Sequence, residues 1–351
     1  MSTEPITDAA RSVLVAIPTL NEVHTLAGVV DALRADPPEG VRVSIVVVDG
    51  GSDDGTVALV RRLQRRRPEL SLLPNPQRLQ SAAVNLAALT ASPSTDVLIR
   101  CDAHASYPPG FVRRLLDTLA RTGADAVVVP MDSTGRGRLQ RAIAWISDTP
   151  VGSGGSAHRG GRRSGFIDHG HHAAFRLDSF RRAGGYDESF SHNEDAEFDC
   201  RQRALGGRIY LDADIRIGYH PRDRLRDLWR QYFGYGRGRA RTMQRHPGST
   251  RLRQLAVPAH AAWTVSALLA APWWPLPLAW PALYLAILAC VSLRLAIKQK
   301  SLCGLLAGPA AAVMHTAWAA GFFWSLARVR EPRWTPEQAT PWPRDGLRWK
   351  G

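Results

Sequence analysis

The sequence predicts an α/β domain with a Rossmann-like, mainly parallel sheet, followed by membrane-associated helices toward the C-terminal end. Two observations predict this fold class. Short, continuous apolar runs alternate with helix-like segments between residues 13 and 129, and three long apolar stretches follow after residue 250. Apolar strands that alternate with helices are typical of a parallel sheet that is covered on both faces.

The elements of the sheet domain follow one another in a regular order. Strands are expected at Val13–Ile17, Val43–Val48, Leu70–Leu73, Val97–Ile99 and Ala126–Val129, and helices at Thr25–Leu33, Val57–Arg67, Gln80–Leu89 and Pro109–Ala120. Ligands of such sheets bind beyond the carboxyl ends of the strands. Asp49 and Asp102 follow two of the predicted strands and therefore mark the edge where a site is expected.

The segments after this region are less regular. Ser133–Gly165 is rich in Gly, Ser and Arg and is expected to be a mobile loop with one short apolar piece at Ile143–Ile146. Loops of this length are often functional lids. Phe166–Gly185 is expected to form a strand, a turn and a helix, Ala196–Leu205 a helix, and Ile209–Ile217 a strand.

From Pro221 onward, arginines are interleaved with aromatic and other apolar residues. The pattern predicts a basic amphipathic helix that is broken near Gly234–Gly238. Such a helix lies in a membrane interface with its aromatic side chains at the level of the headgroups. A solvated basic face packed on the domain is the alternative.

Three long apolar stretches follow, at Leu255–Trp274, Leu276–Ile297 and Leu302–Val329. Each approaches the ~20 residues that are needed to cross a bilayer, and tryptophans lie near several of their ends. Basic residues late in the second stretch and just after it predict a cytoplasmic loop; these are Arg294, Lys298 and Lys300. Three spans would leave the basic tail outside, so two spans plus a re-entrant or interfacial segment stays open. A soluble helical bundle is the remaining alternative.

We therefore expect a catalytic sheet domain at 1–220, a basic interface segment at 221–250, hydrophobic helices at 251–330 and a basic tail at 331–351. The formal net charge of +14 favours polyanionic partners such as nucleic acid, anionic lipid or phosphorylated substrates. The 4 cysteines lie far apart without CxxC spacing, which argues against a zinc site or a disulfide framework. The N-terminal residues do not have the pattern of a signal peptide.

The first acidic site is Asp49, which follows an apolar run and precedes a glycine-rich turn that includes Gly51. A carboxylate at a strand end is placed to accept an N–H group of a nucleotide base, and the glycines let the backbone approach the nucleotide. Alone this signal is weak, because Asp-Gly also forms ordinary turns.

The second acidic site pairs Asp102 with His104 after a predicted strand. Residues i and i+2 of an extended segment point to the same side. A carboxylate and an imidazole at this spacing reach one divalent cation, which would bridge diphosphate oxygens. Asp-x-His alone is more often a surface turn than a metal site.

The third acidic site is Glu194 and Asp195, which precede a predicted helix. A carboxylate at a helix start is stabilised by the helix dipole and serves as an N-cap, which is the structural interpretation. The functional interpretation makes Asp195 a general base that takes a proton from an acceptor hydroxyl.

Histidines cluster at His169, His171 and His172. Neighbours on a strand face opposite sides, so His171 and His172 are a poor chelating pair. A strand that lines the cleft, with one or two histidines near the substrate, is favoured over a structural zinc site. Further candidates for contact with an acceptor or a diphosphate, by charge alone, are His220, Arg222 and Arg237.

Four motifs occur in order along the chain, at Val15–Glu22, around Asp49, at Asp102–His104 and at Asn193–Asp195. Together they resemble family 2 glycosyltransferases of the GT-A fold. Members of that family in succinoglycan biosynthesis similarly carry an Asp-Ala-His variant, a His-Gly-His-His-Ala-Ala-Phe stretch and an arginine-rich segment. The last two lie here at His169–Phe175 and Gln231–Gly238. The resemblance spans residues 11–245.

The resemblance implies an inverting transfer of glucose or a similar hexose from a nucleotide-diphosphate sugar, with UDP favoured. The acceptor would be a lipid-linked saccharide in exopolysaccharide or other cell-surface glycan synthesis, at the cytoplasmic face of the inner membrane. Asp195 would be the base with Glu194 beside it, and Asp102 would hold Mg²⁺ or Mn²⁺ with His104 assisting. The residues at the nucleoside would be Pro18, Asn21, Glu22 and Asp49.

Two departures from the family pattern matter. Gly50 stands where many members carry a second acid, so the contact with the base is expected to differ. His104 occupies the position where the family usually has a second metal-binding Asp. Because imidazole is a softer ligand than carboxylate, this change favours Mn²⁺ or weaker metal binding.

Two other functions stay open. A processive polysaccharide synthase usually carries a Gln-x-x-Arg-Trp motif, which Leu228–Tyr232 does not contain. A membrane-tethered nucleic-acid-binding protein would use the basic charge and the interleaved aromatic residues. The acidic motifs would then have no role, so nucleic acid is not an expected partner.

Overall fold

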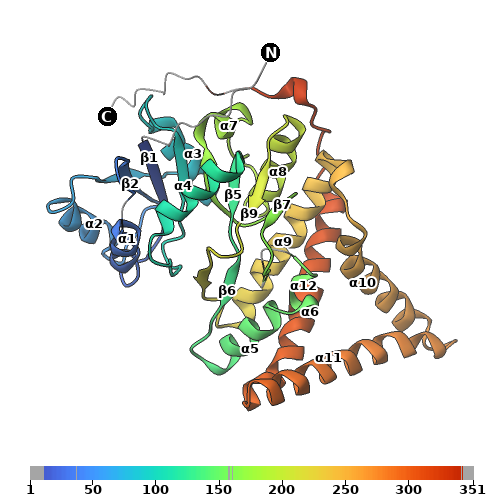
Figure 1. Cartoon of the computed structure of the whole chain (residues 1–351). Coiled ribbons are helices and arrows are strands. Elements are labelled where there is room, and N and C mark those ends of the chain that lie inside the picture. The colour runs from blue at the N-terminus through green and yellow to red at the C-terminus, as the bar shows by residue number, and fades with distance from the viewer. Residues whose placement is uncertain (1–11, 37, 157–158, 160, 341, 343–351) are drawn as a thin grey trace. The chain divides into compact units, whose positions relative to one another are not determined.

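The computed structural model describes residues 12–36, 38–156, 159, 161–340 and 342. These residues form two compact units, which Figure 1 shows as a ribbon. The first unit contains the described residues of 1–131, 161–218 and 335–351, and the second contains those of 132–160 and 219–334. The chain therefore leaves the first unit twice, and its last segment belongs to the first unit again.

A sheet of eight strands forms the frame of the first unit, in the order β3-β2-β1-β4-β8-β5-β9-β7. Six strands run in one direction, whereas β8 and β7 run in the other. The mainly parallel sheet predicted from the sequence is therefore confirmed. The strands are β1 (Ser12–Thr19), β2 (Arg42–Asp49), β3 (Leu70–Pro74), β4 (Val97–Arg100), β5 (Ala126–Val128), β7 (Gly165–Ile167), β8 (His172–Arg176) and β9 (Ile209–Leu211).

Helices with one apolar face alternate with these strands along the chain. In α4 (Phe111–Thr122), for example, Phe111, Leu115 and Leu119 recur every four residues and are buried. The other helices of the unit are α1 (Leu26–Arg34), α2 (Thr56–Gln64), α3 (Gln80–Thr90), α7 (Leu177–Arg182) and α8 (Glu194–Ala204).

The strand expected at Ile209–Ile217 is two strands, β9 and β10 (Ile217–Tyr219), and β10 pairs with β6 (Met131–Ser133). The expectation of one strand was wrong because a turn interrupts the run. The Oδ1 atom of Asp212 accepts a hydrogen bond from the backbone N–H of Asp214, at 3.0 Å. A short polar side chain that bonds its own backbone two residues on is typical of such turns.

An aromatic cluster holds the central strands against the helix that carries the third acidic site. Phe175 of β8, Phe180 of α7 and Phe198 of α8 are fully buried, with ring centroids 5.0–5.5 Å apart. Tyr186 completes the cluster, 5.3 Å from Phe198. Burying one such side chain stabilises the fold by about 1.5–3 kcal/mol, so this cluster fixes α8 on β8.

The second unit is helical. Its α-helices are α5 (Arg138–Ser147), α6 (Pro150–Ser153), α9 (Leu225–Arg245), α10 (Leu252–Ala270), α11 (Ala279–Lys298) and α12 (Ala307–Arg328). Short 3₁₀ turns lie at Pro247–Ser249, Leu276–Leu278 and Leu302–Leu306, and a further one lies in the first unit at Pro336–Gln338. Figure 1 shows α9 and α12 lying side by side, with α10 and α11 extending away from them.

The mobile loop expected at Ser133–Gly165 contains α5 and α6 instead. Composition was misleading there because α5 is stabilised by tertiary packing. Its residues Ile143 and Ile146 are buried in a cluster with Ala311 and Met314 of α12. Most helical stability in proteins comes from such packing of an apolar face.

α9 is continuous, without the break expected near Gly234–Gly238. The glycines there serve helix packing. A Cβ atom on Gly236 would clash with the carbonyl oxygen of Trp318 in α12, and one on Gly321 of α12 would clash with the carbonyl oxygen of Phe233. The two backbones therefore approach more closely than larger side chains would allow.

Two helices of the described chain are long and apolar enough to cross a membrane, namely Leu276–Lys298 and Leu302–Arg328. The first apolar stretch expected from the sequence corresponds to α10, which does not meet that criterion. Polar side chains such as Arg253 and His260 interrupt it, and Pro258 lies inside it.

We predict that Gly236→Ala destabilises the second unit. The added methyl group must push α9 and α12 apart, and overpacking of this kind costs about 1–3 kcal/mol. The expected result is a lower unfolding temperature in detergent. Gly28→Ala is the matched control, because a Cβ atom on this helical glycine has no neighbour within 4 Å. Equal unfolding temperatures for both variants would contradict the close α9–α12 contact.

Candidate active site

The strand directions gather the predicted residues at one edge of the sheet. β1, β2 and β4 are parallel and end at Thr19, Asp49 and Arg100. β8 runs antiparallel to β4, so it begins at that edge with His172. The carboxyl edge of a parallel sheet is where ligands of such folds bind.

The side chain of Asp49 organises the turn that follows β2. Its Oδ2 atom accepts hydrogen bonds from the backbone N–H groups of Gly51 and Ser52, each at 2.9 Å. Its Oδ1 atom accepts one from the hydroxyl of Ser52, at 2.5 Å. Gly51 has a φ angle of 83°, which favours glycine, so this turn depends on both residues.

The turn after β1 is tied to the turn after β2. Asn21 has a φ angle of 57°, its backbone N–H donates to the hydroxyl of Ser52 at 2.8 Å, and its Oδ1 atom accepts from the backbone N–H of Asp53 at 2.9 Å. Pro18 precedes it on β1 and is half-buried beside Val48. The two turns therefore form one rigid wall of the site.

Asp102 lies just beyond β4 among polar and charged side chains. Its Oδ1 atom accepts a hydrogen bond from Gln80 at 2.6 Å and lies 3.7 Å from the guanidinium of Arg100. Its Oδ2 atom lies 3.7 Å from Nε2 of His171. Burial acts to raise the pKa of Asp102, but Arg100 and the histidines outweigh it and lower the pKa, so the carboxylate is ionised.

His104 reaches back to the first turn, where its Nδ1 atom lies 2.7 Å from the Oε1 atom of Glu22. Burial acts to raise the pKa of Glu22, and the hydrogen bonds to His104 and Thr25 outweigh it and lower the pKa. Three of the predicted residues, Glu22, Asp102 and His104, are thus brought together.

The residue types in this group suit a divalent cation whose remaining ligands would come from a bound diphosphate. Asp102 is ionised, its pKa is influenced by His104, and the imidazole of His104 is exposed. Oxygen ligands suit Mg²⁺ and Mn²⁺, and a cation that bridges a diphosphate needs only a few ligands from protein. Within the described residues, no three His, Cys, Asp or Glu side chains form a metal site by themselves.

Glu194 and Asp195 open α8, but neither is its N-cap, contrary to the structural interpretation of the sequence. The N-cap is Asn193, with a φ angle of 62°. Asp195 accepts a hydrogen bond from the backbone N–H of Ala196 at 2.7 Å, and Glu194 is buried with only 9% of its surface exposed.

The pKa values of these two neighbouring carboxyl groups move in opposite directions. Burial and the charge of Asp195 raise the pKa of Glu194 to about 7. Burial also acts to raise the pKa of Asp195, but His169, His172 and Arg100 outweigh it and lower the pKa. Below pH 7 Asp195 is therefore ionised while Glu194 is largely protonated, and such divergence separates an acid from a base.

Arg100 is a site residue that the sequence reading missed. Its guanidinium is buried between the two acidic sites, 3.7 Å from Asp102 and 3.6 Å from Glu194. Its Nε and Nη1 atoms have no hydrogen-bond partner among the described residues. A basic residue at the end of an otherwise apolar strand was the available signal, since a buried charge requires opposite charges nearby.

The histidine cluster is organised by Asp199, which the sequence reading also missed. The Oδ1 and Oδ2 atoms of Asp199 lie 2.6 Å from His172 and 2.7 Å from His169. His172 also contacts the hydroxyl of Tyr186 at 2.7 Å. Asp199 lies one helical turn after Asp195, and this spacing was the signal that placed it on the same face.

His171 and His172 face opposite sides, as expected for neighbours on a strand, since His171 lies toward Asp102 and His172 toward Asp199. The other candidate residues belong to the second unit. His220 contacts the hydroxyl of Thr134 at 3.1 Å, and Arg222 is exposed. Arg237 stacks on the ring of Trp324, 4.5 Å from its centroid.

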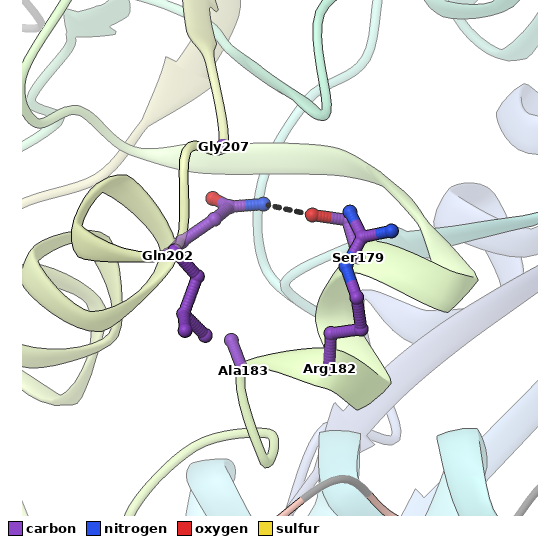
Figure 2. Close-up of a pocket in the computed structure, with 6 residues that line it drawn as sticks. Ser179, Arg182, Ala183, Gln202 and Gly207 are labelled. Atoms are coloured by element: carbon purple, nitrogen blue, oxygen red, sulfur yellow. Dashed lines mark hydrogen bonds between the residues drawn. The ribbon is translucent and has the colours of Figure 1, made fainter. Parts of the chain in front are cut away.

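A small pocket elsewhere in the first unit lies between α7 and α8, as Figure 2 shows. Gln202 donates a hydrogen bond across it to the hydroxyl of Ser179, at 3.1 Å. The pocket has no room for even a water-sized molecule, so it is not a candidate ligand site.

The fold agrees with the comparisons to known proteins. The sequence profile of glycosyl transferase family 2 matches residues 14–184. The chain belongs to this family and is a family 2 glycosyltransferase. It is 42% identical to the succinoglycan biosynthesis protein ExoA of Rhizobium meliloti (strain 1021). The aligned 336 residues cover 94% of this chain and 99% of that protein.

Two solved structures show the same fold. One is the mannosyltransferase PcManGT from Pyrobaculum calidifontis in complex with GDP-Man and Mn²⁺, with a TM-score of 0.53 and 22% identity over 91% of this chain and 88% of that chain. The other is GalNAc-T7 with UDP, GalNAc and Mn²⁺, with a TM-score of 0.52 and 18% identity. That match covers 68% of this chain and 48% of the GalNAc-T7 chain. The GT-A fold expected from the motifs is confirmed.

We predict that Glu194→Gln stabilises the protein at alkaline pH. The folded-state pKa of about 7 lies above the ordinary value of 4.5, so protonated Glu194 favours folding at low pH and this contribution is lost as the pH rises through 7. Glutamine stays neutral, so the variant should gain up to about 3 kcal/mol at pH 8 and nothing below about pH 4. Unfolding temperatures in detergent across this range measure the difference.

The exposed Glu39 provides the control for that experiment. Glu39→Gln removes a carboxyl group from the surface and should leave the pH dependence of unfolding unchanged. A stability gain for Glu194→Gln that is the same at all pH values would contradict the raised pKa.

Proposed function

We propose that this enzyme transfers a hexose, with inversion, from a nucleotide-diphosphate sugar to a lipid-linked saccharide in exopolysaccharide synthesis. The observation that carries the proposal is the pair Glu194–Asp195, whose pKa values diverge beside the buried Arg100. The 42% sequence identity to the succinoglycan biosynthesis protein, over nearly the whole chain, supports exopolysaccharide synthesis as the pathway class. UDP as the nucleotide and glucose as the sugar remain the preferred donor.

The donor half of the site consists of the two linked turns after β1 and β2. Pro18, Asn21 and Asp49 hold these turns in place, and Gly51 keeps the backbone accessible to a nucleotide. Glu22 faces the diphosphate end through its contact with His104. Rigid turns of this kind bind a ligand without first having to be ordered.

Asp102 and His104 would hold the divalent cation, Mg²⁺ or Mn²⁺, and both solved relatives contain Mn²⁺. When bound, such a cation neutralises charge on the departing nucleotide diphosphate. Gln80 and Arg100 keep the Asp102 carboxylate oriented and ionised.

Asp195 accepts the proton of the acceptor hydroxyl. The hydroxyl oxygen then forms a bond to the anomeric carbon while the bond to the diphosphate breaks on the opposite face, which inverts the configuration. The lowered pKa keeps Asp195 ionised before the reaction, and Glu194 remains largely protonated beside it at pH values below 7. His169 and His172 lower the energy of the ionised Asp195, and Asp199 holds both rings.

His169, His171 and His172 would line the acceptor side, and His220, Arg222 and Arg237 would contact the acceptor diphosphate. The membrane is the expected location, with the first unit on the cytoplasmic side, where nucleotide sugars are made. The apolar helices of the second unit support that location. Nucleic acid has no place in this arrangement.

We predict that Asp195→Asn abolishes transfer and leaves donor binding intact. Loss of a general base costs a factor of about 10²–10⁴ in turnover. Purified protein in detergent would be assayed for sugar transfer to lipid-linked acceptors and, separately, for donor affinity by calorimetry. Asp117→Asn, an exposed carboxylate of α4, is the control that should change neither. Unchanged turnover in Asp195→Asn would exclude this residue as the base.

We predict that Asp102→Ala removes metal-dependent donor binding. Wild-type protein should bind one of the UDP-, GDP- or dTDP-sugars in Mn²⁺ or Mg²⁺, and EDTA should abolish that binding. The variant should stay folded, with a lower unfolding temperature because Arg100 loses a charge partner, and it should bind equally weakly with and without metal. Donor binding by Asp102→Ala that still responds to EDTA would show that the cation is held elsewhere.

A further inference from the structure

Two helices of the second unit, α9 and α12, pack against each other along their lengths. Near their starts, Leu228 of α9 shares a buried cluster with Ala311 of α12. At their ends, Glu331 lies just beyond α12 and pairs with Arg241 of α9 at 2.5 Å and with Arg245 at 2.6 Å. The glycine contacts in the middle leave no room for lipid between them. Both helices must therefore share one environment.

α9 is unsuited to the interior of a bilayer. It contains Asp227 and six arginines, which are Arg226, Arg230, Arg237, Arg239, Arg241 and Arg245. One arginine at the centre of a membrane helix costs about 2.5–3.5 kcal/mol, and α9 would place several there. Because α9 cannot cross, α12 cannot cross beside it. The apolar sequence of α12 reflects packing, since 50% of its most apolar window is buried, against 11% for α11.

The start of α12 is also held close to the point where the chain leaves the first unit. α12 packs there on Ile143 and Ile146 of α5. Gln140 of α5 donates a hydrogen bond to the carbonyl oxygen of Pro221, at 2.8 Å. Pro221 follows β10 by only two residues. The start of α12 and the first unit therefore lie on the same side of any membrane.

The exposed apolar surface of this unit is concentrated on α10 and α11. The two helices and the turn between them expose large apolar side chains, among them Trp263, Leu268, Leu269, Trp273, Trp274, Leu283, Leu285 and Leu293. Figure 1 shows the two helices converging on a tip that lies away from α12. Trp273 at that tip is 85% exposed. Exposed apolar surface of this extent marks a membrane-binding or partner-binding site.

The geometry of this hairpin limits how deeply it can reach. α10 follows the end of α9, and α11 leads to the start of α12, so their bases are separated by about one helix length. A 20-residue helix is about 30 Å long, and two such helices that lean together reach less than that distance. The tip therefore stops short of crossing a hydrocarbon core of about 30 Å.

The tip suits hydrocarbon because the backbone donors of its two tryptophans are satisfied. The N–H groups of Trp273 and Trp274 donate to the carbonyl oxygen of Ala270, at 3.0 and 2.9 Å. Pro272 and Pro275 have no N–H group. Unsatisfied backbone groups are what normally exclude turns from the hydrocarbon region.

We propose that the α10–α11 hairpin inserts into one leaflet of a lipid bilayer and leaves on the side of the first unit, and that neither α11 nor α12 crosses. This arrangement also places Lys298 and Lys300, at and just after the end of α11, and Arg328 and Arg330, at and just after the end of α12, on the side of the first unit. Basic residues on one side, next to anionic headgroups, are the expected pattern for cytoplasmic segments. The inference deepens the membrane association within the proposed function.

The test uses the full-length chain in sealed liposomes and needs no enzymatic activity, so a failed transfer assay leaves its outcome unaffected. Cys200 and Cys290 are replaced by serine, whereas Cys101 and Cys303 are buried and remain. Single cysteines are then introduced as Gln299→Cys between α11 and α12, as Arg333→Cys after α12, and as Asp117→Cys in the first unit. All three positions are exposed. A membrane-impermeant maleimide is added before and after permeabilisation.

The expected result is that Gln299→Cys and Arg333→Cys react to the same extent as Asp117→Cys before permeabilisation. Trp273→Cys, labelled with a fluorophore, should be quenched by lipids brominated on their acyl chains, and labelled Asp117→Cys should not. Reaction of Gln299→Cys opposite to Asp117→Cys would show that the chain crosses before α12, and a difference between Gln299→Cys and Arg333→Cys would show that α12 crosses. An unquenched Trp273→Cys would show that the tip is covered by protein or water, and each of these three results overturns the proposal.

Discussion

The candidate active site depends on the reversed direction of one strand, β8. The parallel strands β1, β2 and β4 end at one edge, and they deliver Asp49 and Asp102 there. Because β8 runs the other way, it begins at the same edge and places His171 and His172 beside them. Phe175 of β8 also anchors α8, and α8 positions the acidic pair. One change of direction thus joins residues from distant parts of the chain.

A buried network of charges surrounds that edge. Arg100 lies between Asp102 and Glu194, and Asp199 lies between His169 and His172. Desolvation of buried charges offsets much of their mutual attraction, so such networks add little to stability. Their effect here is to assign different protonation states to neighbouring carboxyl groups, which an isolated pair in water would not show.

Local patterns predicted the first half of the fold well. Each early strand is a continuous apolar run, and each early helix has an apolar face, so Asp49 and Asp102 were located by their position after strands. Arg100 was missed because Glu194, on its other side, is distant in sequence, and Asp199 was missed because His169 and His172 are distant from it. α5 was missed because its stability comes from contacts with α12. Glycines in α9 suggested a break because close helix packing cannot be recognised from one helix alone.

Trp342, the last residue that the structure describes, packs against the core of the first unit. Trp342 packs on Phe180 with ring centroids 5.8 Å apart, and its backbone N–H donates to the carbonyl oxygen of Arg181 at 3.2 Å. Gly185 has a φ angle of 65° and leaves the space that the indole ring occupies. During synthesis on the ribosome, this part of the core cannot be completed until the apolar helices have been made. Completion of the first unit therefore follows synthesis of the apolar helices of the second unit.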